Sequence, residues 1–114
     1  MTFLDGVVNV VSIQTDTDGN LSNTFYTVPS GRFAMVSIEA LQFNNTALNN
    51  DLRLTRDGEF IRLFDPTSSN DRATAVENGP IQFFLGAGDS LQLRASLFSA
   101  VNIIFCTALE YNLP

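Results

Sequence analysis

The sequence predicts an all-β fold: an antiparallel sandwich of two sheets with about eight strands, jelly-roll-like in its strand order. Three observations lead to this prediction. Apolar and β-branched residues occur in short segments, turn-forming residues separate these segments, and no stretch shows the periodicity of an amphipathic helix. An immunoglobulin-like sandwich is the alternative. The length of 114 residues suits a single domain over residues 1–114.

The first three predicted strands are separated by polar turns. The first strand runs from Val7 to Ile13 and precedes a polar segment, residues 15–20, that must turn. The second strand runs from Thr24 to Val28 and is closed by Pro29-Ser30-Gly31, a set of turn-forming residues. The third strand is long, from Phe33 to Phe43, and ends at a pair of asparagines.

The Asp57-Gly58 pair predicts a β-hairpin. It lies between the predicted strands Leu52–Arg56 and Glu59–Phe64, and a two-residue loop of this composition takes positive φ at both positions. The polar segment Pro66–Pro80 follows, and its length indicates a functional or flexible loop. The last three strands are predicted at Ile81–Leu85, Leu91–Leu97 and Val101–Tyr111.

The last predicted strand is apolar on both faces. Ile103, Phe105 and Leu109 point one way, whereas Ile104 and Cys106 point the other way. A strand of this kind is covered on both sides, so we predict that it lies in the middle of a sheet or at an interface. Cys106 is the only cysteine, which excludes an intrachain disulfide, and its apolar neighbours predict a buried, inert thiol.

The two-residue loop also fixes which residues of the hairpin face one another. It places Leu54 opposite Ile61 and Leu52 opposite Leu63, all on one face. These four side chains are apolar, so we predict that this face packs against the core.

The opposite face of the hairpin is the candidate binding surface. It carries Arg53, Phe60, Arg62 and Phe64. Two arginines directly opposite each other repel, and exposed phenylalanines reduce solubility. Both features fit a surface that meets another chain, because arginine and aromatic residues are enriched at interfaces. The alternative is that a loop of the same chain, such as Pro66–Pro80, covers this face.

The composition excludes most catalytic chemistry. There is no histidine, which excludes Ser-His-Asp and Cys-His catalysis and histidine-bound zinc. There is no lysine for a Schiff base or a phosphate-binding loop. A pair of carboxylates could hydrolyse a glycoside, but the chain has no tryptophan and only two tyrosines to hold a sugar. We therefore expect no enzymatic activity, no cofactor and no catalytic metal.

The segment from Asp16 to Asn20 has the one metal-like spacing in the sequence. Its alternating carboxylates suit calcium, but its glycine is misplaced for an EF-hand loop and no bidentate glutamate follows at the required position. We interpret the segment as a solvated turn.

The charge balance limits the classes of partner. The net charge is −6, from twelve carboxylates against six arginines, and no block of basic residues occurs. Nucleic acids and anionic membranes are bound through such blocks, so we expect neither as a partner. No apolar run approaches the ~20 residues of a membrane span. The start of the chain, Met1–Gly6, also lacks the pattern of a secretory signal.

Two turn motifs resemble those of small accessory proteins in the virions of tailed bacteriophages. Thr27-Val28-Pro29-Ser30-Gly31-Arg32 leads into the long third strand. Phe84-Leu85-Gly86-Ala87-Gly88-Asp89 precedes the next-to-last strand, and a final apolar strand ends at Glu110-Tyr111. Over residues 25–111 this order is similar to that of head decoration (cement) proteins and of related tail or fibre modules.

The resemblance implies a β-sandwich that forms a homotrimer and binds the major capsid protein. It implies a location on the capsid surface after synthesis in the host cytoplasm, and no catalytic residues. It also marks residues 1–20 as an extended amino-terminal arm or an exchanged strand. A tail or fibre module that binds a host receptor or glycan is the alternative, although the shortage of aromatic platforms argues against sugars. A soluble trimeric signalling ligand is a third hypothesis, against which the missing secretory signal counts.

Overall fold

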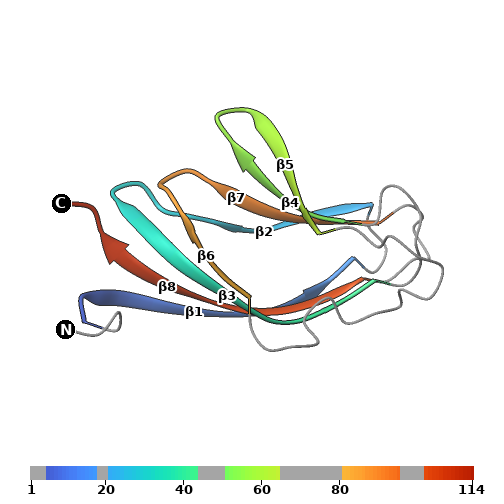
Figure 1. Cartoon of the computed structure of the whole chain (residues 1–114), viewed down its shortest axis with the longest axis horizontal. Helices are drawn as coiled ribbons and strands as arrows, with labels where there is room; N and C mark the ends of the chain where they lie inside the picture. The colour runs from blue at the N-terminus through green and yellow to red at the C-terminus, as the bar shows by residue number, and fades with distance from the viewer. Residues whose placement is uncertain (1–4, 18–20, 44–50, 65–80, 96–101) are drawn as a thin grey trace.

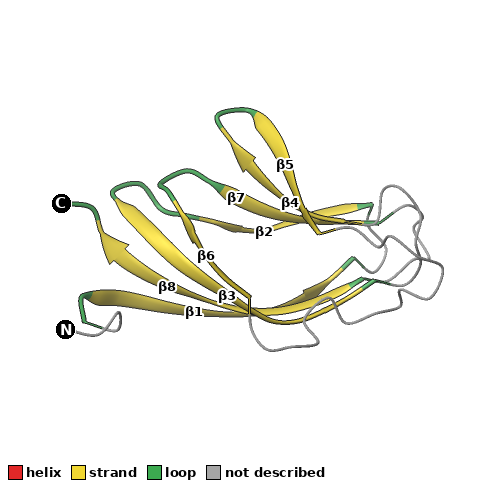
Figure 2. Cartoon of the chain, in the orientation of Figure 1, coloured by secondary structure: helices red, strands yellow, loops and turns green. Residues whose placement is uncertain are grey.

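The computed structural model describes residues 5–17, 21–43, 51–64, 81–95 and 102–114. These residues form eight strands and no helix (Figure 2). The strands are β1 (Val7–Asp16), β2 (Ser22–Thr27), β3 (Arg32–Gln42), β4 (Asp51–Arg56), β5 (Glu59–Phe64), β6 (Ile81–Leu85), β7 (Ser90–Arg94) and β8 (Ile103–Asn112). Each predicted strand is present: β5 and β6 have the predicted bounds, and the others differ by up to three residues. Residues 96, 97 and 101 of the last two predicted strands lie outside the described ranges.

The strands form two stacked antiparallel sheets (Figure 1). One sheet has the order β1-β8-β3-β6, here called sheet A, and the other has the order β2-β7-β4-β5, here called sheet B. The first strand therefore pairs with the last, as expected of a jelly-roll-like sandwich. An immunoglobulin-like order would place the first two strands side by side in one sheet, whereas β1 and β2 lie in different sheets. The predicted all-β, two-sheet antiparallel sandwich is confirmed.

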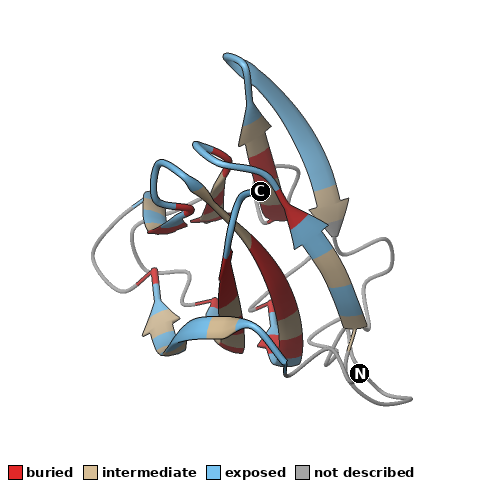
Figure 3. Ribbon diagram, turned by 90° about the vertical axis from the view of Figure 1, so that its left-hand side faces the viewer, coloured by how far each residue is buried: buried red, intermediate tan, exposed pale blue. Residues whose placement is uncertain are grey.

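The core lies between the sheets and is built from alternate side chains of each strand. Val36 and Ile38 of β3 and Ile104 and Cys106 of β8 have no exposed surface. Figure 3 shows the buried residues, in red, mainly within the strands. β8 pairs with β1 on one side and β3 on the other, which confirms the predicted central position in the sheet. Its outward face is not fully covered, however, since Ile103 is 41% exposed. Burial also raises the pKa of the Cys106 thiol to about 12, with a further contribution from Glu39, so the thiol stays protonated.

The Asp57-Gly58 turn has the predicted conformation. The φ angle is 53° at Asp57 and 79° at Gly58, as a type I′ hairpin turn requires. Arg53 pairs with Arg62 across the two strands, and Thr55 pairs with Phe60, as predicted.

The core face of the hairpin differs from the prediction in two respects. The prediction that Leu52 faces Leu63 is wrong, because the register shifts immediately after Leu52 and places Phe64 opposite it. Leu52 and Leu54 are buried, and Leu63 packs against the core, but Ile61 remains 44% exposed. Ile61 stays accessible because β5 is an edge strand and the hairpin extends away from the opposite sheet (Figure 1).

The two turn motifs of the sequence lie side by side in the structure. The Val28 N–H donates to the Asp89 carbonyl at 2.9 Å, and the Gly88 N–H donates to the Val28 carbonyl at 3.0 Å. Arg56 donates to Oδ2 of Asp89 through Nε at 3.0 Å and Nη2 at 2.7 Å. The same oxygen accepts the Gly86 N–H at 2.8 Å. Asp89 therefore joins the β2–β3, β4–β5 and β6–β7 turns at one end of the sandwich.

A buried carboxylate links the two sheets near the same end. Glu110 of β8 is 1% exposed and accepts hydrogen bonds from Tyr26 Oη at 2.6 Å, Arg32 Nη1 at 2.8 Å and Asn9 Nδ2 at 3.0 Å. Burial opposes the ionised form, but these hydrogen bonds outweigh it and lower the pKa of Glu110. Tyr26 belongs to sheet B and the other three residues to sheet A, so the ionised carboxylate holds the sheets together.

Several predictions fall on residues outside the described ranges. Asp18, Gly19 and Asn20 of the calcium-like segment lie outside them, as does the loop Pro66–Pro80. The interpretation of this segment as a solvated turn is wrong at its start, because Asp16 belongs to β1 and Thr17 has no exposed surface. Of residues 1–20, the described part consists mainly of β1, which pairs with β8 of the same chain. The extended or exchanged arm and the single-domain organisation stay predictions.

Candidate binding surface

The candidate surface lies on the outer face of sheet B. Side chains alternate along β4, so Leu52 and Leu54 point into the core while Arg53 points outward. Phe60 and Arg62 of β5 lie on the same outward face, because Phe60 pairs with Thr55 and Arg62 pairs with Arg53. The structure therefore brings three of the four predicted residues together. The side chain of the fourth, Phe64, lies outside the described part.

Arg53 is held between an aromatic ring and an amide. Its guanidinium carbon lies 3.7 Å from the centre of the Phe60 ring, which is a cation–π contact. Its Nε donates to Oε1 of Gln92 at 2.7 Å, and the Gln92 amide donates in turn to Oγ1 of Thr24 at 3.3 Å. One row of contacts thus crosses sheet B from β5 through β4 and β7 to β2.

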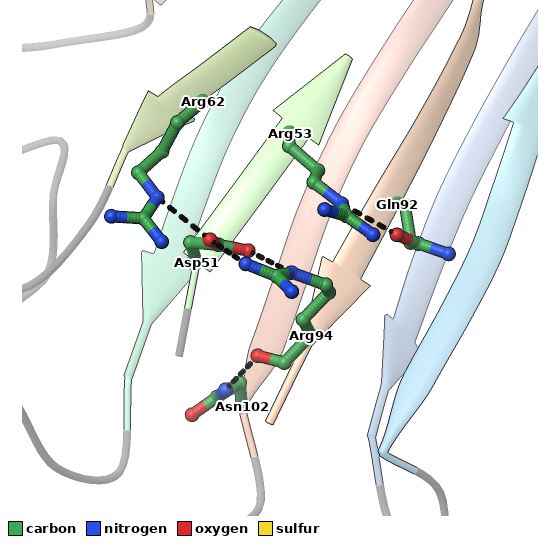
Figure 4. A network of polar contacts seen from close by, with 6 residues as sticks. All are labelled: Asp51, Arg53, Arg62, Gln92, Arg94 and Asn102. Carbon is green, nitrogen blue, oxygen red and sulfur yellow. Dashed lines mark hydrogen bonds and ion pairs between the residues drawn. The ribbon is translucent and has the colours of Figure 1, made fainter. Parts of the chain in front are cut away.

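A second row of contacts centres on Asp51 (Figure 4). Asp51 has no exposed surface. Its Oδ2 accepts from Arg62 Nε at 2.8 Å and its Oδ1 accepts from Arg94 Nε at 2.7 Å, while Arg94 Nη2 also reaches Oδ2. The Arg94 carbonyl accepts the side-chain amide of Asn102 at 2.7 Å. A single buried carboxylate therefore neutralises part of the charge of two arginines.

These contacts change the interpretation of the opposed arginines. The sequence indicated that Arg53 and Arg62 needed either another chain or a covering loop. Instead, Asp51 stabilises the Arg62 charge, and the Phe60 ring and Gln92 hold Arg53, all within sheet B. Phe60 nevertheless remains 58% exposed, so the surface still presents an aromatic ring.

Sequence reasoning missed Asp51, Gln92 and Arg94. Asp51 adjoins a polar run and was excluded from the predicted strand. Gln92 and Arg94 alternate with Leu91 and Leu93, which places them on an outward face, but only long-range pairing places β7 beside β4. The sequence signal for Gln92 and Arg94 was therefore their alternation with leucines, which indicates an outward face but not the residues that they contact.

A second exposed surface lies on the outer face of sheet A and was also missed. Val10, Leu109, Met35 and Phe84 are neighbours across β1, β8, β3 and β6, and we call these four residues the apolar band. Its two ends are exposed, Val10 by 59% and Phe84 by 64%, whereas Met35 between them is only 6% exposed.

Among the described residues, no group of three or more His, Cys, Asp or Glu could hold a metal ion. We also find within these ranges no helical segment with the length and apolar character needed to span a bilayer.

Comparison with known proteins places the fold among solved structures. The chain matches no protein-family model and no curated protein sequence. It is similar to a pentameric capsid protein isolated from metagenomic phage sequences, with a TM-score of 0.51 and 21% identity over 90% of this chain and 69% of that chain. The chain shares its fold with this capsid protein.

A second structure of a pentameric capsid protein isolated from metagenomic phage sequences has a TM-score of 0.49 and 22% identity. The match covers 90% of this chain and 62% of that one, so the chain spans less than two thirds of its length.

Proposed function

We propose that this chain is a structural protein of a bacteriophage virion and acts at the capsid without catalysing a reaction. The observation that carries the proposal is the similarity in fold to a pentameric capsid protein from metagenomic phage, which extends over 90% of the chain. Two features of the sequence add support: it lacks the histidine and lysine of common catalytic sites, and its two turn motifs resemble those of phage accessory proteins.

More specifically, we propose that the protein is a decoration or cement protein on the outer surface of the head. Each copy would contact the major capsid protein and other copies of itself, in the trimer that the resemblance implies or in a ring of another size. Binding to neighbours that already have fixed positions raises the effective concentration of each contact. Many weak contacts of this kind stabilise a shell without any one large interface.

The outer face of sheet B is the proposed contact with the capsid. It offers the exposed ring of Phe60 and the planar guanidinium of Arg53, two residue types that commonly anchor interfaces. Arg62 contributes to this face through its ion pair with Asp51.

Location tests the proposal directly. Purified virions would be analysed by quantitative mass spectrometry and electron microscopy to obtain the copy number and position of the protein. A decoration protein is expected in a fixed ratio to the major capsid protein, on the head. A few copies per particle at the tail would support the recognition module instead, and absence from particles would refute both.

The contact surface is tested on particles that lack the protein. We expect Phe60→Ser to weaken rebinding strongly while leaving the fold intact, because the ring is largely exposed. Phe84→Ser, on the opposite face, is the matched control. Equal rebinding by both variants would show that sheet B is not the contact surface.

A further inference from the structure

Arg53 differs from the other described arginines in its ionic partners. Four of the five described arginines contact a carboxylate of the same chain: Arg32 with Glu110, Arg56 with Asp89, and Arg62 and Arg94 with Asp51. Arg53 contacts no carboxylate within the described ranges, although the chain has twice as many acidic residues as arginines. Its contacts there are with Gln92 and the Phe60 ring.

These contacts fix the orientation of the Arg53 guanidinium. The Phe60 ring covers one face, and Gln92 accepts the Nε–H at 2.7 Å. The side chain extends from β4 toward Gln92 of β7 (Figure 4). The two terminal nitrogens of a guanidinium present parallel N–H bonds, the geometry that a carboxylate accepts. Because the Arg53 side chain is already ordered, it would lose little conformational entropy when a ligand binds.

The surrounding charges favour an anion at this position. Arg94 and Arg62 lie near Arg53, and their positive charges oppose its ionised form, while Asp51, which both of them contact, favours it. Partial burial, together with the nearby Arg94, lowers the pKa of Arg53, which means that the present surroundings disfavour its charge. A bound anion would relieve this effect.

We propose that the outward edge of Arg53 binds a carboxylate of an acidic segment of a protein partner. The exposed Phe60 ring beside it provides an apolar contact for a neighbouring residue of the same segment. Nucleic acid fits less well, because phosphate backbones are bound through several cations, whereas the described part of this face has one guanidinium without a carboxylate partner and the chain is strongly acidic. The inference names the partner chemistry of the proposed capsid contact and rests on that proposal for its biological setting.

The test uses the full chain and three probes in low-salt buffer: a capped Leu-Glu-Leu peptide, the matched Leu-Gln-Leu peptide and hexathymidylate. Binding is followed by NMR through the Arg53 Nε–H and the Gln92 side-chain amide. We expect only the glutamate peptide to shift these signals. Arg53→Gln is expected to weaken its binding about tenfold, the usual effect of losing one charge-assisted contact.

Two further variants separate the site from general effects on folding or charge. Arg53→Lys keeps the charge but loses the planar fork, so we expect intermediate binding. Phe84→Ser lies on the other sheet and is expected to bind as the unmodified chain does. Unchanged binding by Arg53→Gln, or no binding of the glutamate peptide, would overturn the inference. Shifts caused by hexathymidylate alone would identify a nucleic-acid ligand instead. None of these outcomes alters the copy number in virions, which tests the proposed function separately.

Discussion

Arg53 and Arg62 face each other across the β4–β5 hairpin, and different contacts stabilise the two charges. Arg62 is ion-paired with Asp51, whereas Arg53 lies against the Phe60 ring and donates to Gln92. The alternation of side chains predicted which residues share this face. It could not predict Asp51 or Gln92 as their partners, because those contacts depend on the bounds of β4 and on the pairing of β4 with β7.

Removing the charge of Asp51 should destabilise the fold. The Asp51→Asn variant would remove the charge of the buried carboxylate that Arg62 and Arg94 share. We expect a loss of about 2 kcal/mol in the free energy of unfolding, measured by urea denaturation. Glu59→Gln, at an exposed position, is the control and should change stability by less than about 0.5 kcal/mol. Equal effects of the two substitutions would contradict a stabilising role for Asp51.

Stability should fall in acid because two carboxylates are ionised and hydrogen-bonded in the folded state. The hydrogen bond from Arg56 lowers the pKa of Asp89 against the opposing effect of burial, and the pKa of Glu110 is lowered as described above. A lowered folded-state pKa stabilises the protein above the unfolded-state pKa, which is about 4 for both residue types. This stabilisation is lost as the pH falls from that value through the folded-state pKa.

Urea unfolding at a series of pH values between 7 and 2 checks this prediction. The Glu110→Gln and Asp89→Asn variants should be less stable at pH 7 but should depend less steeply on pH below about 4. If both variants lose stability in acid as steeply as the unmodified chain, these carboxylates are not the cause.

At the scale of elements, the hairpin shows which local features a sequence specifies. Asp57-Gly58 set the turn type, and the turn set the register of the residues next to it. The prediction failed at Leu52, where a register shift alters the pairing. Such a shift leaves no local sequence signal here, because it depends on how the far end of the hairpin fits the rest of the sheet.

The turn itself yields a prediction with an internal control. Gly58 has φ of 79°, and a Cβ there would meet no atom within 4 Å, so Gly58→Ala would be opposed by backbone conformation alone. We expect a loss of about 1 kcal/mol in unfolding free energy. At Gly86 the φ angle is not in the left-handed region, and a Cβ would lie 3.7 Å from Oδ2 of Asp89, an ordinary contact. Gly86→Ala should therefore cost less, and the reverse order in thermal or urea unfolding would contradict this account.

At the scale of the whole molecule, the sequence predicted the class of fold and the outward face of the hairpin, but not the apolar band on sheet A. Short alternating segments and turn residues specified eight strands. The apolar band could not be predicted, because Val10, Leu109, Met35 and Phe84 come from four strands that are distant in sequence. The pairing of β8 with β1 and β3, together with the pairing of β3 with β6, brings them together, and such non-local contacts are not encoded in any one segment.

The apolar band and the net charge act against each other on the isolated chain. A net charge of −6 repels other copies, whereas the exposed ends of the band, Val10 and Phe84, favour association. Salt shortens the range of the repulsion, to about 8 Å at physiological ionic strength. We therefore expect self-association to increase with sodium chloride concentration in sedimentation velocity experiments.

The band is then distinguished from the other exposed rings by substitution. Val10→Ser combined with Phe84→Ser should suppress the salt-dependent association, whereas Phe60→Ser on sheet B should leave it nearly unchanged. Because all three side chains are more than half exposed, the variants should differ little from the unmodified chain in unfolding free energy. If the molecular mass obtained from sedimentation velocity does not change with salt, the band is too small to hold two copies together.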